Sequence, residues 1–244
     1  MTESLTFIDG DSILFSSCYG DKTSQAMAES RYREKVEFIK TNTFADKVFV
    51  AVKGKGNFRH DIYPNYKGTR PKLDEHYQNK IELLRTYAVE QMDAVVCDGW
   101  EADDQVVAWA YLAQEKGYDW VISGIDKDLL QYPGNHFNYG GSVKKPIPMD
   151  DRWTFVTPED GWNRFCMQLL TGDNIDNIIG IKGVGPKKAE KALAGLDHKP
   201  KMHKVVEMYK DFFKDQWELQ LILNCHMIYM RRWIEDEFNY KEHM

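Results

Sequence analysis

Three short apolar segments run directly into acidic residues, and this repeat limits the possible folds more than any other feature of the chain. Residues 5–8 and 94–97 are mostly apolar, residues 118–123 have an apolar centre at Trp120, Val121 and Ile122, and all three have the length of buried strands. The acids that follow them are Asp9 after the first, Glu101, Asp103 and Asp104 after the second, and Asp126 and Asp128 after the third. Because the carboxyl ends of parallel strands meet at one edge of a sheet, the sequence predicts that these acids converge there.

Helical patterns separate the strands. Residues 24–44, 73–88, 101–116 and 159–170 read as helices, and residues 47–52 form a further strand rich in β-branched side chains. This alternation predicts an α/β fold with a mostly parallel, twisted sheet flanked by helices. The 244 residues suffice for one such domain with a small appended piece.

The acids allow two interpretations. A helix start favours negative charge, so Glu101, Asp103 and Asp104 are explained as capping residues, and Asp9 with Gly10 as an ordinary turn. Seven or eight carboxylates at one edge would, however, repel one another without a counter-charge. Oxygen ligands with no His or Cys nearby favour Mg²⁺ or Mn²⁺ over zinc. The four cysteines are far apart and indicate neither a disulfide framework nor a zinc site.

The net charge of −6 argues against a nucleic-acid partner, but its distribution does not. If eight clustered carboxylates hold metal ions, the rest of the chain carries a charge of +2. No apolar run approaches the ~20 residues that span a bilayer, and the first residues lack the features of a signal peptide. We therefore expect a cytoplasmic protein with no membrane partner, and a monomer by default.

Residues 53–72 are basic and aromatic, with six Lys or Arg residues against one Asp. Such a mixture suits phosphate contacts and base stacking. Lys67 and Arg70 are three residues apart, so a helical turn would point both at one phosphate. The alternative is an exposed basic loop. The aromatic residues Phe58, Tyr63 and Tyr66, which lie between the basic ones, argue against this alternative.

A glycine-rich turn follows two further acids, Asp173 and Asp176. Glycines at 180, 183 and 185 make a tight turn, and Pro186 is placed to begin a helix. This is a helix-hairpin-helix pattern that binds phosphate without reading bases. The lysines that add positive charge are Lys182, Lys187 and Lys188.

Together these motifs resemble the flap endonuclease family, and within it the 5′-to-3′ exonucleases of bacteriophages and the 5′-nuclease domain of bacterial DNA polymerase I. They keep the family's order from residue 9 to about residue 189. The motifs are Asp9, Phe58-Arg59, Tyr66-Lys67-Gly68-x-Arg70, Glu101-Ala102-Asp103-Asp104, Ser123-x-x-Asp126-Lys127-Asp128-x-x-Gln131, and Gly172-Asp173-x-x-Asp176-Asn177-Ile178-x-Gly180-x-x-Gly183-x-Gly185.

The resemblance implies a PIN-like 5′-nuclease fold and a hydrolase that cuts phosphodiester bonds near 5′ ends of flapped, nicked or branched DNA, or of RNA in RNA–DNA hybrids. It implies two ions of Mg²⁺ or Mn²⁺, K⁺ at the glycine turn, and replication proteins as partners, in the host cytoplasm if the chain is phage-encoded. One ion would be held by Asp9, Glu101, Asp103 and Asp104, and the other by Asp126, Asp128, Asp173 and Asp176.

The same resemblance assigns the basic residues. Lys67 and Arg70 would polarise the scissile phosphate, and a terminal base would stack on Tyr66. The other expected DNA contacts are Arg59, Lys182, Gly183, Gly185, Lys187 and Lys188. The implied organisation is a nuclease domain over residues 1–157 with a helical arch at about 53–87, a helix-hairpin-helix lobe over 158–200, and C-terminal helices over 201–244 that pack back on the domain.

One departure from the family is visible. The family has an Asp at the end of its second strand, about six residues before the Phe-Arg pair, and this chain has Val52 or Lys53 there. Two hypotheses follow: Lys53 supplies a permanent cation in place of an ion, or Asp11 compensates from the first strand. If neither holds, a structure-specific DNA-binding protein with weak catalysis is the alternative.

A second alternative is a haloacid-dehalogenase-like phosphatase. Asp9-Gly10-Asp11 after a strand resembles the aspartyl nucleophile motif of that family, and Gly172-Asp173 resembles its later acidic motif. That family places its later acids at the end of a strand. Here Gly172-Asp173 follows a helical pattern, so the nuclease interpretation is preferred.

Overall fold

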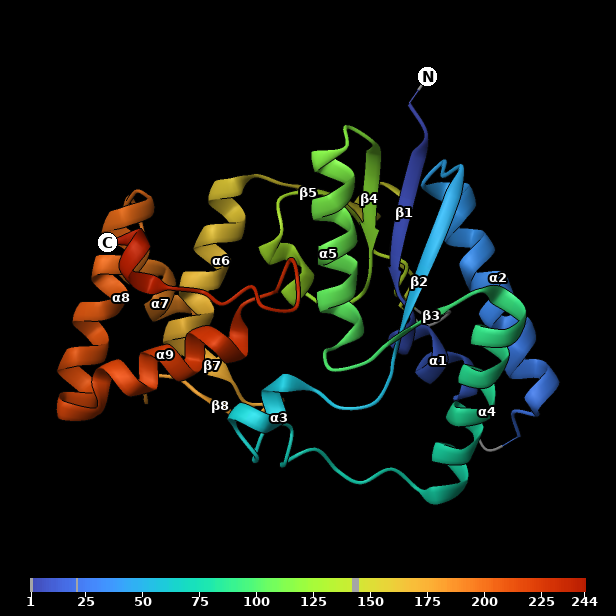
Figure 1. Ribbon diagram of the computed structural model, residues 1–244, viewed down its shortest axis with the longest axis horizontal. Helices are drawn as coiled ribbons and strands as arrows, with labels where there is room; N and C mark the ends of the chain where they lie inside the picture. Colours follow the sequence, from blue (N-terminus) through green and yellow to red (C-terminus); the bar gives the residue numbers. More distant parts are fainter. Residues whose placement is uncertain (1, 21, 142–144) are drawn as a thin grey trace.

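Six strands form one sheet in the order β3-β2-β1-β4-β5-β6 in the computed structural model, which describes residues 2–20, 22–141 and 145–244 (Figure 1). The first five strands in this order are parallel, and β6 runs antiparallel to β5. The strands are β1 (Ser4–Asp9), β2 (Lys47–Lys53), β3 (Val95–Cys97), β4 (Asp119–Ser123), β5 (Gly134–Phe137) and β6 (Trp153–Val156). The predicted fold class is confirmed.

Helices cover both faces of the sheet. On one face pack α1 (Gly10–Cys18), α2 (Gln25–Asn42) and α4 (Glu75–Met92), whose apolar side chains form one core cluster with β1 and β2. On the other face lies α5 (Ala102–Glu115), which packs against β1, β2 and β3 (Figure 1). The central strand β1 is buried on both faces, as a parallel strand of near-continuous apolar residues requires.

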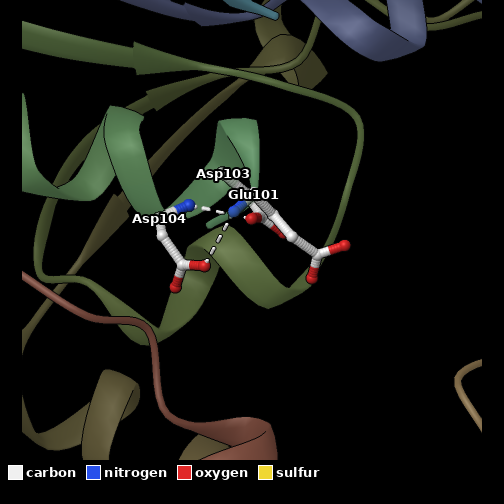
Figure 2. A group of neighbouring side chains, drawn as sticks. All are labelled: Glu101, Asp103 and Asp104. Carbon is white, nitrogen blue, oxygen red and sulfur yellow. Dashed lines mark hydrogen bonds between the residues drawn. The ribbon is translucent and has the colours of Figure 1, made fainter. Parts of the chain in front are cut away.

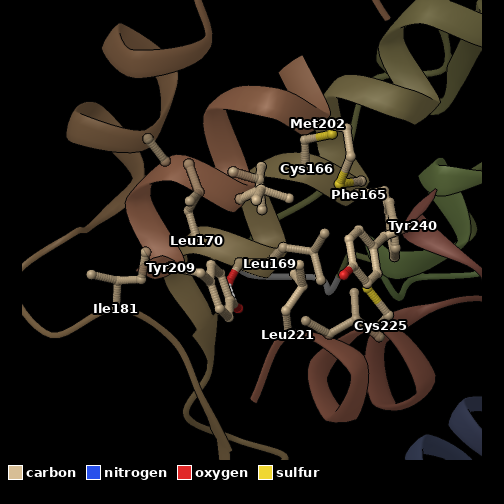
Figure 3. Packing of buried hydrophobic residues seen from close by; sticks show 14 of the residues in the cluster. Phe165, Cys166, Leu169, Leu170, Ile181, Met202, Tyr209, Leu221, Cys225 and Tyr240 are labelled. Atoms are coloured by element: carbon tan, nitrogen blue, oxygen red, sulfur yellow. Dashed lines mark hydrogen bonds between the residues drawn. The ribbon is translucent and has the colours of Figure 1, made fainter. Parts of the chain in front are cut away.

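A separate helical lobe follows the sheet. It contains α6 (Pro158–Thr171), α7 (Pro186–Leu193), α8 (His198–Phe213) and α9 (Trp217–Ile228), with a small hairpin of β7 (Gly172–Asp173) and β8 (Ile178–Ile179). These helices share one apolar core, part of which Figure 3 shows around Leu169, Tyr209 and Leu221. The 3-10 turns are η1 (Asp128–Gln131), η2 (Asp150–Arg152), η3 (Lys214–Gln216) and η4 (Tyr240–His243).

The C-terminal helices differ from the expectation that they pack back on the nuclease domain. Residues of α8 and α9 bury their apolar side chains against α6 and α7, so they belong to the helical lobe. The chain returns to the sheet domain at the end of α9 and in the tail that follows. There the backbone oxygens of Met227 and Tyr229 accept from Arg59, and the Arg231 N–H donates to Asp104.

The segment expected as a helical arch, at about residues 53–87, contains the short helix α3 (Phe58–Ile62) and the first part of α4. Residues 63–70 then form successive turns, in which the N–H of Tyr66 donates to Tyr63 and that of Gly68 to Asn65. The helical turn predicted for Lys67 and Arg70 is therefore wrong, because Lys67 has a left-handed backbone (φ 55°) that a right-handed helix cannot contain. Further on, α4 belongs to the layer beside α1 and α2.

Residues 136–147 begin in β5 and lead toward β6. β5 and β6 pair antiparallel, through a connection that includes η2. Residues 142–144 of this region lie outside the described part of the chain.

Candidate metal and nucleic-acid site

A small cleft lies where the N-terminus of α5, the turn after β4 and the β7–β8 hairpin meet. Gln168 of α6 and Met227, Ile228 and Met230 also line it. The predicted site residues that line it are Arg59, Tyr66, Lys67, Arg70, Glu101, Asp103, Asp126, Asp128, Asp173 and Asp176. The structure thus brings together acids from two strand ends of the sheet and from the hairpin of the helical lobe.

The first acidic group is at the start of α5, where Figure 2 shows Glu101, Asp103 and Asp104 around one helical turn. One carboxylate oxygen from each lies within 4.8 Å of the others. The group also caps the helix, since Asp103 accepts from the Asp104 N–H at 2.8 Å and Asp104 from the Glu101 N–H at 3.4 Å. Capping and ion binding are compatible for Asp103, which keeps its second oxygen for other partners.

Asp104 is a correction to the predicted ligand set. Its side chain is fully buried and its two oxygens both face the guanidinium of Arg59, at 2.9 Å for Nη2 and closer for Nη1. Asp104 Oδ1 also accepts from the Arg231 N–H at 3.1 Å. These donors take up most of the lone pairs of Asp104, so it is the member of this group that is least available to an ion.

Arg59 is the second correction, because it was expected to contact DNA. Its side chain is 2% exposed and binds Asp104, Glu101 and the backbone oxygens of Met227 and Tyr229. A guanidinium buried in this way reaches no external phosphate. It holds α3, α5 and the C-terminal tail together instead.

Glu101 and Asp103 of the first group differ in the direction in which their pKa values are shifted. Burial raises the pKa of Glu101, but Arg59 and Lys67 more than offset this, and the pKa is held well below its usual value. Burial together with the charges of Glu101 and Asp104 raises the pKa of Asp103. Asp103 is therefore the acid of this group that gains most from a cation placed beside it.

The second acidic group comes from the turn after β4 and from the hairpin. Asp126 accepts from the Asp128 N–H at 2.8 Å, and Asp128 accepts from Gln168 Nε2 at 2.7 Å. Burial and the charge of Asp126 raise the pKa of Asp128 to about 6. Asp173 accepts from the backbone of the hairpin turn at 2.7 and 3.2 Å, which fixes its carboxylate at the same cleft.

Asp9 lies at the end of β1 and is not among the residues that line the cleft. It is 6% exposed, begins α1 as its N-cap, and accepts from the Asp11 N–H and the Ser12 hydroxyl. Burial and the charge of Asp11 raise the pKa of Asp9 to about 7. Asp126 also contributes to this rise, which places the β1 and β4 acids within electrostatic reach of each other.

Asp11 reaches the end of the second strand, where the family's acid is absent. Its Oδ1 accepts from the Lys53 N–H at 3.0 Å and lies 3.8 Å from Arg85. The charge of Glu101 acts on Asp11 across this space. A carboxylate carried by α1 thus stands at the carboxyl end of β2, while the Lys53 side chain is exposed.

The basic pair lies at the cleft but is directed at its acids. Lys67 Nζ contacts Glu101 and lies 3.7 Å from Asp176, and Arg70 contacts Asp176. Tyr66 is a third correction: its ring is 3% exposed and packs into the core of the helical lobe, so neither ring face is open to a base. Its hydroxyl bonds to Glu101 and Asp176.

The glycine turn has the predicted form. Gly183 has φ 84°, Gly185 precedes α7, and Pro186 is the first residue of that helix, as predicted. Lys182, Lys187 and Lys188 are all exposed, and Lys188 Nζ also donates to the Gly183 carbonyl at 2.7 Å. The exposed lysines and the turn are open to a phosphate backbone, and the K⁺ site stays a prediction.

Sequence reasoning missed residues of α6 that shape the site. Gln168 binds Asp128, and Arg164 lies 3.5 Å from the same carboxylate. The spacing of four residues puts both on one helix face directed at the cleft. The available signal was this spacing of two polar residues four positions apart in the predicted helix.

The donor set fits a hard divalent cation. The lining of the cleft offers carboxylate oxygens and, over its described residues, no His or Cys. The pKa values of Asp9, Asp103 and Asp128 are raised, so the protein compensates their charged forms only in part. Mg²⁺ or Mn²⁺ has the ligand preference that this arrangement satisfies. Elsewhere in the fold, the described helices are all too short or too polar to cross a membrane.

Comparison with known proteins places the sheet domain in a family. Residues 4–150 match the profile of the 5′-3′ exonuclease, N-terminal resolvase-like domain. The chain is 34% identical over 141 residues to DNA polymerase I of Rhizobium leguminosarum, which covers 56% of this chain and 14% of that protein. It is 30% identical over 173 residues to a 5′-3′ exonuclease of Mycoplasma pneumoniae, which covers 68% of this chain and 57% of that one. The chain thus spans only part of these relatives.

Solved structures share the fold. The bacteriophage T5 flap endonuclease in a pseudo-enzyme–product complex with DNA and metal ions aligns with a TM-score of 0.70 at 16% identity, over 91% of this chain and 87% of that one. The T5 5′-exonuclease with bound zinc aligns with a TM-score of 0.65 at 18% identity, over 92% and 85%. The catalytic core of Rad2 in complex with DNA aligns with a TM-score of 0.53 at 14% identity, over 90% and 67%.

Proposed function

Because this chain belongs to the family of 5′-3′ exonuclease N-terminal, resolvase-like domains, we propose that it is a divalent-metal-dependent 5′ nuclease that hydrolyses phosphodiester bonds at or near the 5′ ends of flapped, nicked or branched DNA. The observation that carries the proposal is the convergence of two carboxylate groups, from α5 and from the β4 end with the hairpin, on one cleft. The hairpin that supplies Asp173 belongs to the same lobe as the exposed glycine turn.

The acids divide into two ligand groups. Glu101 and Asp103, with Asp9 behind them, would hold one ion; Asp126, Asp128, Asp173 and Asp176 would hold the other, directly or through water. When bound, Mg²⁺ or Mn²⁺ supplies an activated water and charge stabilisation for the leaving oxygen. Asp104 is left out of the first group because Arg59 occupies its oxygens.

The cations at the cleft mouth would act on the phosphate. In the structure, Lys67 pairs with Glu101 and Arg70 pairs with Asp176. A phosphate bound between the two acidic groups would give these cations a second acceptor. Lys182, Lys187 and the N–H groups near Gly183 and Gly185 would grip a duplex backbone without reading its sequence. Two features stay as extensions of the proposal: cutting of RNA in hybrids, and K⁺ at the turn.

Asp11 is proposed as the replacement for the absent second-strand acid. The support is its position, since its carboxylate stands at the end of β2 against the Lys53 N–H. The opposing hypothesis gives Lys53 the role of a fixed cation, and the exposure of the Lys53 side chain does not favour it. The phosphatase alternative loses its basis, because Gly172–Asp173 forms β7 in a separate two-stranded sheet that follows α6.

Cleavage of a 5′-labelled DNA with a single-stranded 5′ flap tests the proposal. We expect wild type to cut near the junction in Mg²⁺ and not in EDTA, and Asp128→Asn to lose at least about 100-fold in rate, as removal of a group that stabilises transition-state charge does. Asp119→Asn, which changes an exposed acid at the opposite end of β4, is the matched control.

Asp11→Asn should lose activity as well. Unchanged cutting by Asp11→Asn would contradict the compensation hypothesis alone and leave the proposed nuclease intact. Tight DNA binding by wild type without any cutting would contradict the nuclease and favour the DNA-binding alternative.

A further inference from the structure

The Tyr66 hydroxyl lies between two carboxylates from opposite walls of the cleft. It is 2.7 Å from Glu101 Oε2 and 2.9 Å from Asp176 Oδ2. Glu101 precedes α5 in the sheet domain, whereas Asp176 belongs to the hairpin turn of the helical lobe. A tyrosine hydroxyl has one proton to donate, so the two acids share a single donor at this point.

The ring of Tyr66 is fixed in place. It is 3% exposed and belongs to the apolar core of the helical lobe, with the His60 ring edge-on at 5.3 Å and the Lys67 ammonium 4.8 Å from its centre. A buried aromatic ring with one polar end has little freedom, so it sets the place of its hydroxyl.

The backbone on either side of Tyr66 is also tied to the hairpin. The Lys67 N–H donates to the Asp176 carbonyl at 2.9 Å, and the Asn177 side chain donates to the Asn65 carbonyl at 2.9 Å. Lys67 and Arg70 contact the same two acids, but through long side chains that are 22% and 47% exposed. The rigid contact between the two walls is therefore made by Tyr66.

We propose that Tyr66 is a positioning residue whose hydroxyl sets the orientation and separation of the Glu101 and Asp176 carboxylates, and through them of the two metal-ligand groups. This inference rests on the proposed function. It replaces base stacking as the role of Tyr66, since stacking needs an open ring face. Hydrogen bonds to ligating carboxylates contribute about 10- to 100-fold to metal affinity or activity in metalloproteins generally.

The two roles predict opposite results for one substitution. Tyr66→Phe keeps the ring and removes the hydroxyl, so a stacking residue would tolerate it and a positioning residue would not. We expect Tyr66→Phe to weaken Mn²⁺ binding, measured as free Mn²⁺ by EPR, by about 10- to 100-fold, and to slow single-turnover flap cutting by a similar factor. Tyr66→Ala should do no less harm.

Tyr209→Phe is the matched control. Tyr209 is a buried tyrosine of the same core, and its hydroxyl bonds to the Leu169 carbonyl and Asn224, away from the acids. The Tyr209→Phe variant should be less stable than wild type but should keep the wild-type affinity for Mn²⁺. A purely structural role for the Tyr66 hydroxyl predicts that the two Phe variants behave alike.

A second measurement keeps the test decisive if Tyr66→Phe does not fold. With 3-fluorotyrosine placed at position 66 of the full chain, the ¹⁹F resonance should shift as Mg²⁺ saturates the protein, because the partners of the hydroxyl bind the ion. Wild-type Mn²⁺ affinity in Tyr66→Phe, or a fluorine resonance indifferent to Mg²⁺, would overturn the inference. If wild type binds Mn²⁺ but cuts no DNA, the proposed nuclease fails while the Mn²⁺ comparison still decides the role of Tyr66.

Discussion

At the scale of single residues, the main result is that acids of one cluster have different tasks. Asp104 is neutralised by Arg59 inside the protein, whereas Asp9, Asp103 and Asp128 keep a raised pKa because the protein compensates their charged forms only in part. The second kind of acid destabilises the fold when it ionises, and such groups are the ones that a cation stabilises. The difference lies in the partners of each carboxylate.

The raised pKa of Asp9 predicts the direction in which the free energy of unfolding changes with pH. In the unfolded chain its carboxyl titrates near the usual value of 3.8, and in the folded protein near 7, so the folded state holds an extra proton between these values. The free energy of unfolding therefore falls as the pH rises through this window. In EDTA, Asp9→Asn should be more stable than wild type at pH 8 by on the order of 1–3 kcal/mol, and about equal at pH 4. Urea unfolding at the two pH values measures this, and equal stability at pH 8 would contradict it.

At the scale of elements, the N-terminus of α5 is the junction on which the site depends. It receives Arg59 from α3, the tail after α9 through Arg231, and Tyr66 from the turns between α3 and α4. Met227 and Met230 also line the cleft. The start of α5 thus joins three parts of the chain that are far apart in sequence: residues 58–70, residues 101–104 and the tail after α9.

Arg59 tests this assembly. Arg59→Met leaves Asp104 buried without its partner, and breaking a buried ion pair in this way costs about 3–5 kcal/mol. We expect that loss in urea unfolding, and we expect the double variant Arg59→Met with Asp104→Leu to recover much of it, since apolar replacement of both partners is often neutral. If Arg59→Met kept wild-type stability and lost only DNA affinity, the original expectation of a DNA contact would be correct instead.

At the scale of the whole molecule, sequence reasoning predicted the sheet and the convergence of the acids. Strand periodicity and the acids at strand ends are local signals, and parallel pairing then dictates one edge. The roles of Arg59, Asp104 and Tyr66 depend on contacts with residues more than 30 positions away in sequence, such as Met227 and Asp176, which carry no local signal. The helical turn at Lys67 failed for a related reason, because contacts with the hairpin hold that residue in a left-handed conformation.

The central claim is that one cleft between the sheet and the helical lobe holds divalent ions with acids from both. Crystals of wild type soaked in Mn²⁺, measured at the manganese absorption edge, test it most directly. The account predicts two anomalous peaks in the cleft, one beside Glu101 and Asp103 and one beside Asp128 and Asp173, both lost on soaking with EDTA. Peaks absent from this cleft at millimolar Mn²⁺, or ligated by Asp104 in place of Asp103, would contradict it.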